Sequence, residues 1–104
     1  MITVILESQS GEILDKTSMI GNEEYLSQDD ASFTFLSLLS VASCDVFKCS
    51  DMPELIHELE RIRSCRSNIE EIKHIDMIIK LASRCHSSPG STLVFTPFEN
   101  TFED

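Results

Sequence analysis

Two helix-start patterns follow each other closely in the second half of the chain, and they constrain its fold more than any other feature. Asp51 with Glu54, and Ser67 with Glu70, have the spacing of a capping box. In that motif a short polar side chain and an acid three residues later bond free amides at the start of a helix. Apolar residues recur at helical spacing after each start, and the link between the two segments is short. The pattern predicts two helices packed as an antiparallel hairpin.

The two helices, expected over residues 51–65 and 68–85, should each bury one face. Along the first, the apolar residues at helical spacing are Leu55, Ile56, Leu59 and Ile62. Along the second they are Ile69, Ile72, Ile75, Ile78, Ile79 and Ala82. The residues expected to face water on the first helix are Glu54, His57, Glu58 and Arg61. His74, which lies off the apolar stripe of the second helix, is also expected to be exposed.

Short β-branched segments predict the strands of a small sheet. Residues 2–6 are almost continuously apolar, as in a strand covered on both faces, and 12–16 return after a turn as the second arm of a hairpin. Residues 45–49 and 91–95 predict two more strands. Residues 31–43 fit either a strand or a helix capped by Asp30 or Ser32, and the sequence leaves both open. The fold class is therefore α+β, with a small antiparallel or mixed sheet and helices, including the hairpin, packed on one face.

The chain of 104 residues predicts a single domain over 1–104. Its apolar runs are far shorter than the ~20 residues that a membrane span requires, so we expect no membrane association. The N-terminal sequence MITVILESQ lacks the basic region of a signal peptide. These features predict a cytoplasmic protein.

Patterns that carry catalysis or hold metals are lacking in the sequence. It contains three glycines and no phosphate-binding loop, and neither H-E-x-x-H nor C-x-x-C occurs. The four cysteines are Cys44, Cys49, Cys65 and Cys85. Their spacing does not suit a zinc site, and we expect buried free thiols. The sequence predicts no enzymatic activity, no cofactor and no metal.

The chain has a formal net charge of −10, and much of its negative charge lies in two segments. Residues 19–30, expected as an acidic mobile loop, contain four carboxylates, and no lysine or arginine occurs between Lys16 and Lys48. Residues 97–104 form an acidic tail that also contains phenylalanines. Such a surface repels nucleic acid directly but attracts a basic protein, although acidity can also serve solubility alone. The residues predicted to bind a partner are Glu23, Glu24, Tyr25, Asp29, Asp30, Glu99, Phe102, Glu103 and Asp104.

About half of the chain, residues 45–96, resembles a group of small bacterial proteins. The similarity lies in the strand at Val46-Phe47, the helix start Met52-Pro53 and the segment Leu55-Ile56-His57-Glu58-Leu59-Glu60. It continues in a second helix ending near a cysteine, Leu81-Ala82-Ser83-Arg84-Cys85, and in a closing strand, Leu93-Val94-Phe95. Size, acidity and this layout also resemble immunity proteins of contact-dependent growth inhibition systems. The resemblance implies binding to the toxic C-terminal domain delivered by a neighbouring cell, and it identifies no individual binding residue.

The sequence therefore favours an immunity protein that covers the active site of a basic toxin, most readily a nuclease and within that class a ribonuclease. A regulatory or adaptor domain with a partner unrelated to toxins is the alternative, and it predicts an apolar interface that is insensitive to salt. A small metal-binding module is a second alternative, which elemental analysis of the purified protein would test.

Overall fold

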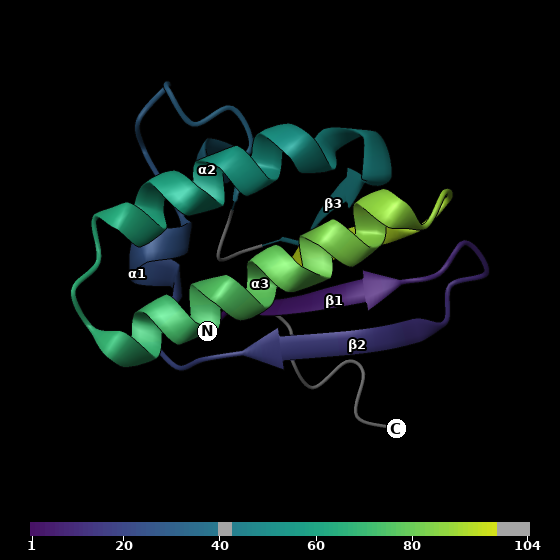
Figure 1. The fold of residues 1–104 in the computed structure, drawn as a ribbon, viewed down its shortest axis with the longest axis horizontal. Helices are drawn as coiled ribbons and strands as arrows, with labels where there is room; N and C mark the ends of the chain where they lie inside the picture. The colour runs from purple at the N-terminus through teal and green to yellow at the C-terminus, as the bar shows by residue number, and fades with distance from the viewer. Residues whose placement is uncertain (40–42, 98–104) are drawn as a thin grey trace.

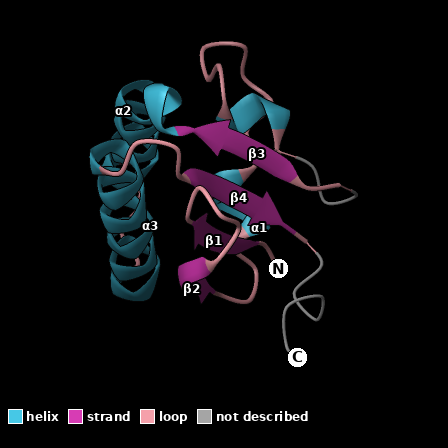
Figure 2. Ribbon diagram, turned by 90° about the vertical axis from the view of Figure 1, so that its right-hand side faces the viewer, coloured by secondary structure: helices cyan, strands magenta, loops and turns pink. Residues whose placement is uncertain are grey.

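The chain folds into a sheet with a layer of helices, described over residues 1–39 and 43–97 in a computed structural model. The elements are β1 (Thr3–Glu7), β2 (Ile13–Ser18), α1 (Glu23–Leu26), the 3₁₀ turn η1 (Leu36–Leu38), β3 (Asp45–Lys48), the 3₁₀ turn η2 (Cys49–Asp51), α2 (Met52–Ser64), α3 (Ile69–Ser87) and β4 (Thr92–Thr96). The four strands pair antiparallel in the order β2-β1-β4-β3. Helices α2 and α3 lie side by side on one face of this sheet (Figure 2). The predicted α+β fold is confirmed.

The helical hairpin connects two neighbouring strands, β3 and β4, and its helices run antiparallel (Figure 1). The start of α3 lies one residue later than predicted, because Asn68 and not Ser67 caps it. The Oδ1 atom of Asn68 accepts bonds from the amides of Glu70 and Glu71, at 2.9 and 3.2 Å. The capping box predicted for α2 is wrong as well. The Asp51 side chain makes no cap bond to this helix. Its Oδ2 atom instead accepts a hydrogen bond from the amide of Lys48, the residue that precedes η2.

The core lies between the sheet and the two long helices. On the helix side of the sheet, Val4 pairs with Phe95, and Leu93 lies between Leu6 and Phe47 in neighbouring strands. The ring of Phe47 meets that of Phe95 edge to face, at 5.5 Å between centroids. The helices contribute buried aliphatic side chains: Leu55, Leu59, Ile62, Ile75, Ile78 and Leu81. Because burial of such side chains dominates folding energetics, this cluster fixes how the hairpin sits on the sheet.

Residues 31–39, left open between helix and strand, form turns and the short η1 instead. Phe33, Leu36 and Leu39 are buried, and their spacing of three matches the three residues per turn of a 3₁₀ helix. Backbone amides at this point bond to a side chain of α2 (see below), so a longer helix is not needed to satisfy them. Residues 40–42 of the predicted segment lie outside the described residues.

Four predictions of burial are wrong. Ile69, expected on the buried face of the second helix, is 62% exposed. Glu58 and His74, expected at the surface, are 2% and 6% exposed. Of the cysteines, expected to be buried, Cys44 and Cys65 are exposed, Cys49 is half-buried and only Cys85 lies in the core. Within the described residues, no helix combines the length and apolar character required to cross a bilayer.

Candidate partner-binding surface

Residues 22–36, here called the acidic segment, begin at a buried asparagine. Asn22 is fully buried, and its side chain bonds both backbone groups of Ile2: Oδ1 accepts the amide and Nδ2 donates to the carbonyl, each at 2.7 Å. This pairing fixes the orientation of the Asn22 amide. Nδ2 also donates to His74 Nε2 on α3, at 3.1 Å, so His74 is neutral with its proton on Nδ1. The start of the segment is thereby attached to both β1 and α3.

Burial lowers the pKa of His74 below the ordinary histidine value of 6.5. As the pH falls below about 6.5, the unfolded chain therefore binds a proton that the folded chain resists. Stability should be complete above this pH and decline as the pH falls through the folded-state pKa, by at most about 1.4 kcal/mol per pH unit from this group. We expect His74→Gln to flatten the fall in urea-derived unfolding free energy between pH 7.5 and pH 5.

His57→Gln is the matched control for that measurement, since His57 lies exposed on α2. It should leave the pH dependence of the wild-type protein unchanged. Identical pH slopes for His74→Gln and the wild type would show that the buried imidazole does not contribute to acid destabilisation.

The far end of the acidic segment is held by Glu58, which is buried on α2. Its carboxylate accepts the amide of Phe35 at 3.1 Å and the amide of Leu36 at 3.0 Å. Between these two attachments, Tyr25, Leu26 and Phe33 are also buried. Residues 23–26 of the predicted loop form α1, and the buried side chains lie on both sides of the exposed residues 29–32.

The four carboxylates of the segment differ in what they contact. Glu23 forms an ion pair with the N-terminal ammonium of Met1 at 3.1 Å, and bonds from its own amide and from that ammonium lower its pKa. The Asp30 carboxylate accepts the Ser32 amide at 2.9 Å, and this bond lowers its pKa. The side chains of Glu24 and Asp29 are exposed and contact no bonding or ionic partner among the described residues. Glu24 and Asp29 are thus the two acids that the fold leaves available.

Tyr25, predicted as an aromatic anchor for a partner, is a core residue with 4% of its surface exposed. Its hydroxyl bonds to the sulfur of Met19 at 3.5 Å. Burial, together with the charge of Glu71, raises its pKa to about 12. The hydroxyl therefore stays protonated at neutral pH. The ring is buried, so it forms a wall of the site and does not project towards a partner.

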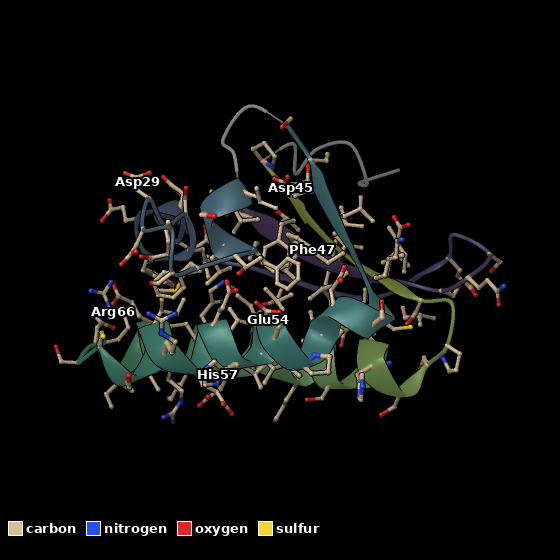
Figure 3. All side chains as sticks on the ribbon, turned by 90° about the horizontal axis from the view of Figure 1, so that it is seen from above. Asp29, Asp45, Phe47, Glu54, His57 and Arg66 are labelled. Carbon is tan, nitrogen blue, oxygen red and sulfur yellow. The ribbon has the colours of Figure 1, made fainter. Side chains whose placement is uncertain are left out.

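Two arginines, Arg61 on α2 and Arg66 in the link that follows it, face the acidic segment, although the sequence around that segment contains no cation. Arg61 donates to the carbonyl and hydroxyl oxygens of Ser32, at 3.0 and 3.1 Å, and its guanidinium lies 4.1 Å above the Phe33 ring. The guanidinium of Arg66 lies 5.5 Å from the centre of the Tyr25 ring. Figure 3 shows Arg66 at the end of α2 and Asp29 on the acidic segment at the same end of the molecule. The positive charges beside the acidic segment therefore come from residues that are distant from it in the sequence.

A pocket of about 410 Å³ lies between the acidic segment and the end of α2. Its apolar lining comes from Tyr25, Phe33 and Ile62, and its charged lining from Glu24, Arg61 and Arg66. No cluster of three histidine, cysteine or carboxylate side chains suited to a metal occurs in residues 1–39 and 43–97. The geometry suits binding of another molecule's side chains, with both signs of charge present at one place.

Of the residues predicted to bind a partner, the structure brings together Glu23, Glu24, Tyr25, Asp29 and Asp30. Glu99, Phe102, Glu103 and Asp104 lie outside the described residues. The sequence reasoning missed Asn22, Glu58, Arg61 and Arg66. For Glu58 a signal existed, since it lies three residues after Leu55 and four before Ile62, on the buried face of α2.

Sequence and structure were also compared with those of other proteins. No protein-family model matches the chain, and neither a curated protein nor a solved structure matches it.

Proposed function

We propose that this chain is an immunity protein, which binds a basic toxin domain and covers its active site with the acidic segment. The observation that carries the proposal is the pair Glu24 and Asp29, which are exposed and have no bonding partner among the described residues, on a segment whose two ends are fixed by buried bonds. The toxin would be a nuclease, and within that class a ribonuclease. The inhibitor would act in the cytoplasm, where such a toxin meets its substrate, and it would have no enzymatic activity of its own.

The physical reason is complementarity between the two proteins. A nuclease cleft is positive because it holds phosphates, and fixed carboxylates can occupy the same positions. Because both ends of the acidic segment are held by buried bonds, less of it would have to be ordered on binding, and that lowers an entropic cost of association. Opposite charge also accelerates encounter, to ~10⁸–10⁹ M⁻¹s⁻¹ at low salt, which suits interception of a toxin.

The test is charge reversal at the two available acids, Glu24→Lys with Asp29→Lys. Neither side chain bonds within the fold over the described residues, so the variant should fold normally. Against the toxin domain that the proposal implies as the partner, we expect the association rate at low salt to fall about tenfold, with a smaller change in the dissociation rate. Stopped-flow or biolayer measurements over a series of sodium chloride concentrations would show it.

The matched control is Glu12→Lys with Glu54→Lys, which makes the same change in net charge. Both side chains are exposed, in the turn between β1 and β2 and at the start of α2, at the opposite end of the molecule from α1 (Figure 1). An equal loss of association rate in both double variants would show that only net charge matters and would remove the acidic segment as the interface. Binding of the wild type that is indifferent to salt would favour the adaptor alternative.

A further inference from the structure

Arg66 differs from the other arginines in its hydrogen bonding. Arg61, Arg63 and Arg84 each donate at least one side-chain bond, to Ser32, Asp76 and Asp15. The Arg66 guanidinium, with 34% of its side chain exposed, donates none to any described residue. The carboxylate paired with it belongs to Glu71, at 3.7 Å, which is beyond hydrogen-bond distance. No nitrogen of this guanidinium is fully buried, so water reaches its N–H donors in the free protein, and a carboxylate of a ligand would replace that water.

The pocket beside Arg66 indicates what kind of acceptor would fit. Tyr25, Phe33 and Ile62 make its apolar walls, and the guanidinium groups of Arg61 and Arg66 each lie near the face of an aromatic ring. A planar guanidinium bonds a carboxylate through two parallel N–H···O contacts. The apolar walls suit a short aliphatic chain leading to that carboxylate.

We propose that this pocket receives an acidic side chain, glutamate or aspartate, of the protein partner, with Arg66 as the residue that binds its carboxylate. This inference rests on the proposed function and deepens it. Basic groups of the partner would face Glu24 and Asp29, while one of its acids enters the pocket beside them. Positive and negative contacts that alternate across an interface fix how the two surfaces align. They also disfavour a partner whose surface carries only positive charge.

Carboxylates already present set the expected affinity and selectivity. Glu24 lines the pocket and Glu71 lies next to Arg66, and both repel an incoming anion. A free carboxylate should therefore bind weakly, with a dissociation constant on the order of tens of millimolar. Inorganic phosphate has no aliphatic chain to contact the apolar walls, so it should not bind more tightly than the carboxylate compound at the same ionic strength.

The experiment is an NMR titration of the ¹⁵N-labelled protein with N-acetyl-glutamate N-methylamide at constant ionic strength. We expect a saturable shift of the Arg66 Nε–Hε signal, with no comparable shift at Arg63 or Arg84. The neutral glutamine analogue should produce none. Arg66→Lys should weaken binding about threefold or more, because lysine cannot make the two-bond contact, and Arg66→Gln should abolish it. Arg63→Gln, at an exposed arginine paired to Asp76, is the matched control and should leave the titration unchanged.

Three outcomes would overturn the inference. They are the absence of a saturable Arg66 shift up to about 100 mM of the compound, an equal response to the neutral analogue, and tighter binding of phosphate than of the carboxylate. The titration involves no toxin, so its failure is distinct from failure of the proposed function. If charge reversal at Glu24 and Asp29 leaves toxin binding unchanged while Arg66 still binds the carboxylate, the proposed interface fails and the pocket stands.

Discussion

Replacement of Glu58 by alanine is expected to destabilise the protein by about 3 kcal/mol, which is a large share of the stability of a domain of this size. The carboxylate is buried and bonds two amides, those of Phe35 and Leu36. Burial of a charge is itself unfavourable, so the carboxylate adds less than two charged bonds would suggest. Its removal, however, leaves both amides without an acceptor, and this penalty dominates. Urea unfolding should show the loss directly, with a melting temperature lower by on the order of 10 °C.

Two further variants make the interpretation specific. Glu60→Ala removes an exposed carboxylate from the same helix and should change stability by less than about 0.5 kcal/mol. Glu58→Gln keeps one oxygen acceptor but turns an N–H₂ group towards amides that need acceptors, so an intermediate loss is expected. If Glu58→Ala were as stable as Glu60→Ala, the carboxylate would not hold the far end of the acidic segment.

Asn22→Ala should cost a similar amount, about 3 kcal/mol. The side chain satisfies three buried polar groups at once: the amide and carbonyl of Ile2 and the Nε2 atom of His74. Alanine leaves all three without this partner in a site that excludes water. We expect lower unfolding free energy in urea and faster hydrogen exchange at the Ile2 amide, because the attachment of the segment to β1 is lost.

Asn68→Ala provides the comparison for that measurement. Asn68 also bonds two backbone amides, at the start of α3, but it is exposed, and water can replace it. Its removal should cost about 1 kcal/mol, as for other helix caps. Equal losses of unfolding free energy in Asn22→Ala and Asn68→Ala would mean that burial of the Asn22 bonds adds no stability. The hydrogen bonds to Ile2 would then not hold the acidic segment as described.

Local sequence patterns predicted the regular elements because those patterns reflect local geometry. The helical hairpin and the strands follow from the periodicity of apolar residues, which reflects geometry over a few residues. Glu58 and His74 were misplaced because each was assigned to the polar face of its helix. Glu58 lies three residues from Leu55, and His74 lies four from Ile78, so both occupy the apolar stripe. A polar residue at such a position predicts a buried bond as readily as an exposed side chain.

The candidate site could not be assembled from the sequence in the same way. Asn22 and His74 are 52 residues apart, and Arg61 meets Ser32 across 29 residues. Contacts of this kind depend on how α2 and α3 pack on the sheet. The pattern of residues within one segment does not specify that packing. For that reason the lack of lysine and arginine near the acidic segment suggested isolated carboxylates, whereas Arg61 on α2 and Arg66 in the link after it lie against that segment.

The central strands of the sheet come from opposite ends of the chain, since Val4 pairs with Phe95 and Thr3 with Thr96. Closure of so long a loop is slow compared with formation of a local hairpin. During synthesis on the ribosome, β1 must therefore wait until β4, which lies far along the sequence from it, has emerged before its second neighbour arrives. Until then one edge of a strongly apolar strand stays open, and the nascent chain is most exposed to aggregation or proteolysis in that interval.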